Sequence, residues 1–129
     1  MRRRSVLAAG AALVVLGADL AHEALTPTPF HHTRPAGVFV LGAVVALALL
    51  ALAPRVPSLV VALGAGIAAG GALGIAVSGF AWGGVPDPFV AGGLTFNVSD
   101  LAIGAGDALL IVSVAAHAWA HRGALREPV

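Results

Sequence analysis

Residues 58–80 read SLVVALGAGIAAGGALGIAVSGF, an apolar run without a charged side chain. A helix of about 20 such residues crosses the roughly 30 Å hydrocarbon core of a bilayer, and this run is long enough to do so. Gly66, Gly70 and Gly74 recur at every fourth position, so they lie on one face of that helix. The stretch therefore predicts a membrane helix whose glycine face lets neighbouring helices approach closely.

Three further apolar segments accompany this run, at residues 5–25, 37–53 and 99–120. The chain of 129 residues is 59% hydrophobic and 10% charged, with a mean hydropathy of +0.97, whereas about a quarter of the residues of a soluble domain are charged. Runs without alternation of apolar and polar residues favour helices over a barrel in a bilayer. The sequence therefore predicts an all-α, polytopic membrane protein in which residues 1–129 form one domain of four transmembrane helices.

The arginines indicate how the spans are oriented. The residues Arg2 to Arg4 precede the first span, Arg55 lies between the second and third, and Arg122 and Arg126 follow the fourth, while Arg34 lies on the other side. By the positive-inside rule, both termini are predicted to be cytoplasmic. The run of arginines at the start also resembles a secretory signal, but the three spans that follow favour an uncleaved anchor.

The composition also limits the chemistry. The chain has no cysteine, which excludes disulfides, thiolate catalysis and cysteine-ligated metals. Its net charge of +1 gives no reason to expect nucleic-acid binding. His117 and His121 have the spacing of a metal-ligand pair on a helix, but two ligands make a poor site. We therefore predict neither a metal nor a cofactor.

With this topology, nearly all polar side chains other than arginine gather at the outer ends of the spans. Asp19 and Glu23 share one face near the outer end of the first span, Ser78 lies at the end of the third, and Asp100 begins the fourth. Ionisable groups at a membrane boundary are costly and are therefore candidate functional groups. Asp87 lies in the second outer loop, which we expect to rest against the membrane and cover the helix ends.

Other roles are open for several of these residues. Asn97, Ser99 or Asp100 could cap the fourth helix, because side-chain oxygens accept from its free N–H groups. Asp107 lies two turns below Asp100 on the same face, about 10.5 Å deeper. We expect an unpaired carboxylate at that depth to find a partner inside the bundle or to take up a proton. The outer histidines could simply meet water and headgroups (His22, His31 and His32).

The start of the fourth span resembles signal peptidase II, the bacterial lipoprotein signal peptidase. That family carries a Phe-Asn-x-Ala-Asp block there, whose aspartate is one of its two catalytic carboxylates. The matching residues are Phe96, Asn97, Val98, Ser99 and Asp100, with serine in the alanine position. The glycine-rich residues 70–74 are similar to the first half of the family motif that ends the third span, and Asp19 matches a family aspartate in the first span.

The chain departs from this family where the other catalytic aspartate is expected. Ser78 stands at that position, Ile75 replaces an asparagine and Gly79 an arginine, while Glu23 replaces a lysine of the first span. Aspartic peptidases work because two carboxylates share one proton and hold a water between them. Serine cannot take either role at neutral pH.

The resemblance implies a multi-pass protein of the bacterial cell (inner) membrane that contacts lipid, and a divergent or degenerate aspartic endopeptidase. It implies a catalytic role for Asp100, with Asp87 as the candidate partner carboxylate, and binding roles for Asn97, Asp19 and Ser78. The first hypothesis is a protein that binds lipid-modified signal peptides or transmembrane helices without cleaving them.

Two other hypotheses are open. The second is an active lipoprotein signal peptidase that uses Asp100 with Asp87. The third is a small proton- or ion-handling membrane bundle, in which four carboxylates line a polar path (Asp19, Glu23, Asp100 and Asp107). A dyad needs two carboxylates within reach of one water, whereas a path needs a polar chain that continues inward past Asp107.

Overall fold

The computed structural model describes residues 1–123, and the predicted topology signal at Arg126 lies outside them. The chain is mostly helical, with four helices that are long and apolar enough to cross a membrane. They are α1 (Arg2–Leu25), α2 (Ala36–Leu52), which continues into the short helix η1 (Ala53–Arg55), α3 (Leu59–Trp82) and α4 (Val98–Ala120). Their bounds agree with the predicted spans to within a few residues, so the four-helix prediction is confirmed.

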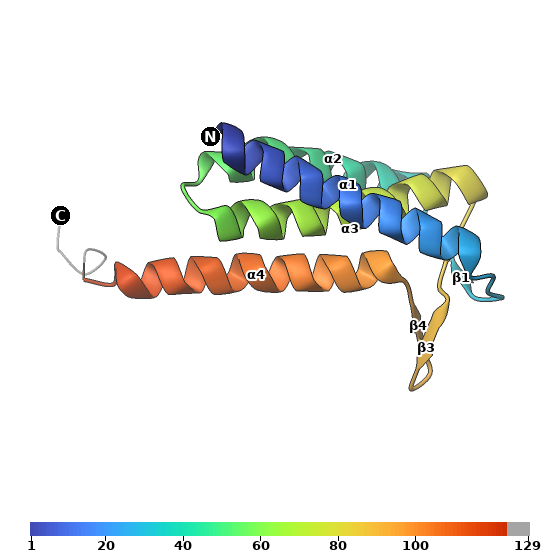
Figure 1. Cartoon of the computed structure of the whole chain (residues 1–129). Helices are drawn as coiled ribbons and strands as arrows, with labels where there is room; N and C mark the ends of the chain where they lie inside the picture. The colour runs from blue at the N-terminus through green and yellow to red at the C-terminus, as the bar shows by residue number, and fades with distance from the viewer. Residues whose placement is uncertain (124–129) are drawn as a thin grey trace.

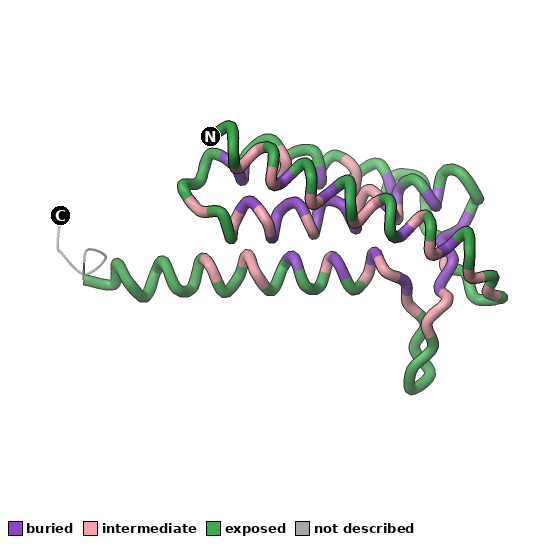
Figure 2. The backbone as a smooth tube through the Cα atoms, viewed as in Figure 1, coloured by how far each residue is buried: buried purple, intermediate pink, exposed green. Residues whose placement is uncertain are grey.

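The helix α3 forms the core of the bundle (Figures 1 and 2). In its most apolar stretch 61% of the residues are buried, against 11–17% in the other three helices. The glycine face explains this difference, because a Cβ at Gly70 or Gly66 would collide with the backbone of α1. Another close approach lies on α4, where a Cβ at Gly106 would lie 2.5 Å from the backbone nitrogen of Ala68. Small residues thus let three helices pack directly on α3.

This packing gives a stability prediction for Gly70→Ala. The added Cβ would lie 2.7 Å from the carbonyl oxygen of Ala12 and 2.8 Å from Cβ of Val15. Because the nearest atom is backbone, α1 must shift, and we expect a loss of about 1–3 kcal/mol in the free energy of unfolding. Unfolding in detergent, followed by circular dichroism, measures it. The matched control is Gly17→Ala, since a Cβ at Gly17 meets nothing within 4 Å. Equal stability of the two variants would contradict this packing.

Two short pairs of strands at one end of the bundle were not predicted. β1 (His31–His32) pairs with β2 (Val85–Pro86), and β3 (Phe89–Ala91) pairs with β4 (Leu94–Phe96), both antiparallel. Gly92 and Gly93 have φ of 57° and 81°, as a tight hairpin turn between β3 and β4 requires. This end, where α1 and α3 finish and α2 and α4 begin, is called the strand end below (Figure 1).

The N-terminus and the last turn of α4 lie at the opposite end (Figure 1). There Nε of Arg4 donates to the carbonyl oxygen of Pro54 at 2.8 Å, which ties the start of α1 to the turn before α3. Ser58 caps α3 by accepting from the backbone N–H of Val61. The arginines that predict a cytoplasmic side therefore share one end of the bundle, and the strand end is the predicted outer end.

Candidate functional site

Six polar side chains are buried in the described chain, and all belong to the strand end. They come from α1, α3, α4 and the connection after β2 (Asp19, Glu23, Ser78, Asp87, Asn97 and Ser99). Burying a polar group is costly unless it is hydrogen-bonded. Each of the six makes at least one hydrogen bond, so together they form a polar core above the apolar bundle. We call this set the polar cluster.

Asp19 holds the first turn of α4 against α1. One carboxylate oxygen accepts from the backbone N–H of Ser99 at 2.8 Å, and the other accepts from the hydroxyl of Ser99 at 2.6 Å. Gly74 leaves the room for this contact, because a Cβ there would collide with both side chains. Asp19 therefore binds a helix N-terminus of this chain with both of its oxygens and has a packing role.

Ser78 is directed at α1 and not into a shared site with Asp100. Its hydroxyl donates to Oε2 of Glu23 at 2.5 Å, and both side chains are buried. Oε1 of Glu23 accepts from the side-chain amide of Asn97 at 3.5 Å. Residues 23 and 78, two of the positions at which the sequence differs from the signal peptidase II motifs that it resembles, are therefore direct partners.

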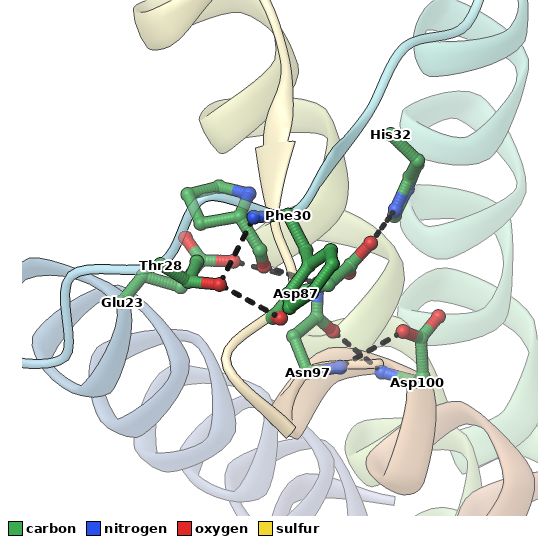
Figure 3. Close-up of polar contacts among 8 residues, drawn as sticks. Glu23, Thr28, Phe30, His32, Asp87, Asn97 and Asp100 are labelled. Carbon is green, nitrogen blue, oxygen red and sulfur yellow. Dashed lines mark hydrogen bonds and ion pairs between the residues drawn. The ribbon is translucent and has the colours of Figure 1, made fainter. Parts of the chain in front are cut away.

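Asn97 connects the two halves of the polar cluster (Figure 3). Besides Glu23, its amide nitrogen lies 3.3 Å from the carbonyl oxygen of Pro86 and 3.4 Å from Oδ1 of Asp87. Its amide oxygen accepts from the backbone N–H of Asp100 at 2.9 Å. A single amide side chain thus positions the end of α1, the segment after β2 and the start of α4.

Asp87 is fixed from several sides. Its Oδ2 lies 2.8 Å from Nδ1 of His32, and its backbone N–H donates to the carbonyl oxygen of Phe30 (Figure 3). Its own carbonyl oxygen accepts from the hydroxyl of Thr28 at 3.3 Å. The segment after β2 is therefore hydrogen-bonded to the segment between α1 and α2, at residues 28–32, and Asp87 is buried.

Asp100 has a cap role and also reaches a cavity. Its Oδ2 accepts from the backbone N–H of Asn97 at 3.0 Å, which with the reciprocal bond forms a capping box at the start of α4. It also lines a cavity of about 260 Å³ between α2, α3 and α4. The other residues around this cavity are His32, Arg34, Val38, Phe39, Gly42, Ala72, Ile75 and Ile103. We call this cavity the cleft.

Three residues of the site were not identified as partners from the sequence. His32 was assigned to the interface but contacts Asp87, and Ser99 was considered only as a cap but binds Asp19. His22 was expected to meet water, yet its Nδ1 is buried without a hydrogen-bond partner and its ring stacks on Phe89 at 4.8 Å. The only sequence feature that pointed to these contacts was that all three residues lie at or near the predicted outer ends of the spans.

Two other predicted features lie apart from the polar cluster. Asp107 is exposed on α4, so of the two alternatives predicted for it, a partner inside the bundle or uptake of a proton, the described residues do not provide the first. The face of α4 that packs on α3 instead carries Gly106, which has no side chain to conflict with Ala68. His117 and His121 stack at 4.2 Å near the opposite end. Among the described residues, no group of three or more His, Cys, Asp or Glu could hold a metal ion.

Comparisons of the chain with family models, with curated proteins and with solved structures found no match.

Proposed function

We propose that this chain is a signal peptidase II-like protein of the bacterial cell membrane that binds a lipid-modified signal peptide without cleaving it. The observation that carries the proposal is the content of the cleft. Asp100 is the only carboxylate among its described lining residues, and the position of the family's other catalytic aspartate is Ser78, which is bound to Glu23. Aspartic peptidases hold a water between two carboxylates, and the described lining of the cleft supplies only one of them.

The cleft offers the chemistry of a binding site for an amphipathic chain. Its walls are apolar side chains of three helices, chiefly Phe39, Ile75 and Ile103. Its polar lining residues, apart from Asp100, are His32 and Arg34, which precede α2 at the strand end. Ligand sites commonly combine apolar walls with a few polar groups that fix orientation. A lipid-modified peptide segment matches both parts, with its apolar portion between the helices and its polar backbone at the strand end.

A second candidate function is cleavage by Asp100 together with Asp87. The observation in its favour is that Asn97 contacts both carboxylates, that of Asp87 through its side-chain amide nitrogen and that of Asp100 through its backbone N–H, so the two belong to one hydrogen-bonded group. Against this function, each carboxylate is already held by another group. The carboxylate of Asp87 contacts Nδ1 of His32, and that of Asp100 accepts from the backbone N–H of Asn97. This function requires both bonds to be given up when a substrate enters.

The ion-handling hypothesis has less support from the geometry. Its path needs polar groups that continue from the polar cluster toward the opposite end of the bundle. Below Ser78, the buried residues of α3 are only alanine and glycine, and Asp107 on α4 is exposed. A chain of hydrogen-bonding side chains through the described bundle is therefore not formed.

The binding proposal is tested by filling the cleft with Gly42→Trp. Gly42 lines the cleft, and a Cβ there meets nothing within 4 Å, so a side chain can be added without a clash at its base, and we expect the indole to occupy the cavity. A fluorescent lipid-modified signal peptide is titrated against the protein in lipid nanodiscs, and we expect the affinity to fall at least about tenfold, or roughly 1.4 kcal/mol. The matched control is Gly17→Trp on α1, where a Cβ also meets nothing within 4 Å. Equal binding by both variants and the unmodified protein would exclude the cleft as the binding site.

A further inference from the structure

Asp107 is the one ionisable side chain that lies exposed in the middle of a span among the described residues. α2 has no polar side chain between Ala36 and Leu52, and α3 has only Ser78, which is buried. No side-chain hydrogen bond or ion pair within the described residues involves Asp107. A carboxylate facing hydrocarbon is costly and, in membrane proteins, is nearly always paired or directed at a functional path. Within residues 1–123 the fold therefore gives this costly group no partner.

The position of Asp107 relates it to the cleft. It follows Asp100 by seven residues, about two helical turns, and it follows Ile103 by about one turn, so the three side chains point to the same side of α4. Asp100 and Ile103 both line the cleft. By this helical spacing Asp107 lies on the side of α4 that carries Asp100 and Ile103, about 10 Å farther along the helix than Asp100 and outside the set of residues that line the cleft.

The surroundings of Asp107 allow a helix to approach. Gly104, one turn before it, is exposed, and a Cβ there meets nothing within 4 Å. α2, which forms the other side of the cleft, contributes only apolar residues along its length. Small residues beside a polar one are typical of the surfaces on which membrane helices associate.

From this geometry we propose that a membrane-spanning helix packs along α4 over the cleft and carries a lysine or arginine at the depth of Asp107. The inference rests on the proposed binding function and names its ligand class. Charge complementarity selects this partner, because an entirely apolar helix would leave the carboxylate unpaired in hydrocarbon. A second copy of the chain that used the same face would bring two carboxylates together, and like charges disfavour such a contact. A lipid headgroup lies at the membrane boundary, about 10 Å from this depth.

The test uses three synthetic leucine–alanine helices in lipid nanodiscs with the full-length protein. One carries lysine at the depth of Asp107, one carries lysine near the opposite end, and one carries leucine instead. We expect the matched lysine helix to bind about tenfold more tightly than the leucine helix, or roughly 1.4 kcal/mol. Asp107→Asn should abolish this preference, and Asp107→Glu should keep most of it. Asp107→Lys should transfer the preference to a helix with glutamate at that depth.

The outcomes separate this inference from the function on which it rests. Equal binding of the lysine and leucine helices, unchanged by Asp107→Asn, would overturn the lysine or arginine partner while the cleft still binds apolar chains. Energy transfer between two labelled copies of the protein that is lost in Asp107→Asn would overturn it in favour of self-association. Failure of all three helices and of the lipid-modified signal peptide to bind would overturn the binding function itself.

Discussion

Replacing Ser78 with aspartate is expected to lower the free energy of unfolding by about 3–5 kcal/mol. The new carboxylate would stand beside Glu23, to which the serine hydroxyl donates at 2.5 Å within the buried polar cluster. Two buried carboxylates at that distance repel, and the hydrogen bond that satisfies Glu23 is lost. Unfolding in detergent, followed by circular dichroism, measures the loss. The matched control is Ser78→Asn, which is close to aspartate in size, adds no charge and keeps a donor for Glu23.

The same pair predicts a rescue. Combining Ser78→Asp with Glu23→Lys replaces the repulsion by an ion pair between aspartate and lysine. Signal peptidase II carries these two residue types at the matching positions. We expect the double variant to regain at least half of the lost stability, and a double-mutant cycle gives the coupling energy between the two sites. Additive effects of the two substitutions would show that residues 23 and 78 are not in contact and would contradict the geometry of the polar cluster.

Asp19→Leu is the second substitution with a large expected effect. It removes the acceptor of both the backbone N–H and the hydroxyl of Ser99, which stay buried without partners. At about 1–3 kcal/mol for each of the two unsatisfied groups, the expected loss is roughly 2–6 kcal/mol in the free energy of unfolding. Asp19→Asn keeps one acceptor oxygen and should lose clearly less. If Asp19→Leu were as stable as the unmodified protein, Asp19 could not be the group that holds α4 against α1.

The helices could be predicted because the length of an apolar run is a local property of the sequence. The glycine spacing also indicated that α3 packs closely against neighbouring helices, since residues four apart lie on one face. The partners of the polar side chains could not be predicted in this way. Ser78 and Glu23 are 55 residues apart, as are His32 and Asp87, and only the packed bundle brings them into contact.

The environment of Asp107 shows a different limit. α4 is apolar on nearly all sides, so its sequence does not indicate which of its faces packs against the other helices. That choice is made by Gly106, which allows contact with Ala68, and it leaves Asp107 on the exposed side. The strand pairs were missed because two- and three-residue strands are too short to show an alternating pattern.

Two positions at which the chain differs from the signal peptidase II motifs that it resembles, residues 23 and 78, are in direct contact. An arginine at Gly79 would be obstructed, because even a Cβ there would lie 2.5–2.8 Å from the ring of Phe39. Phe39 is buried and lines the cleft. Introducing aspartate at position 78 and arginine at position 79 therefore also requires changes at Glu23 and Phe39.

The most direct measurement is a single-turnover assay in lipid nanodiscs that follows both binding and cleavage of a lipid-modified signal peptide, with protein in excess. A binding protein with one carboxylate in its cleft should retain the intact peptide, and Gly42→Trp should release it. Cleavage by the unmodified protein that is lost in Asp100→Asn and in Asp87→Asn would contradict this expectation and establish the peptidase that uses both carboxylates.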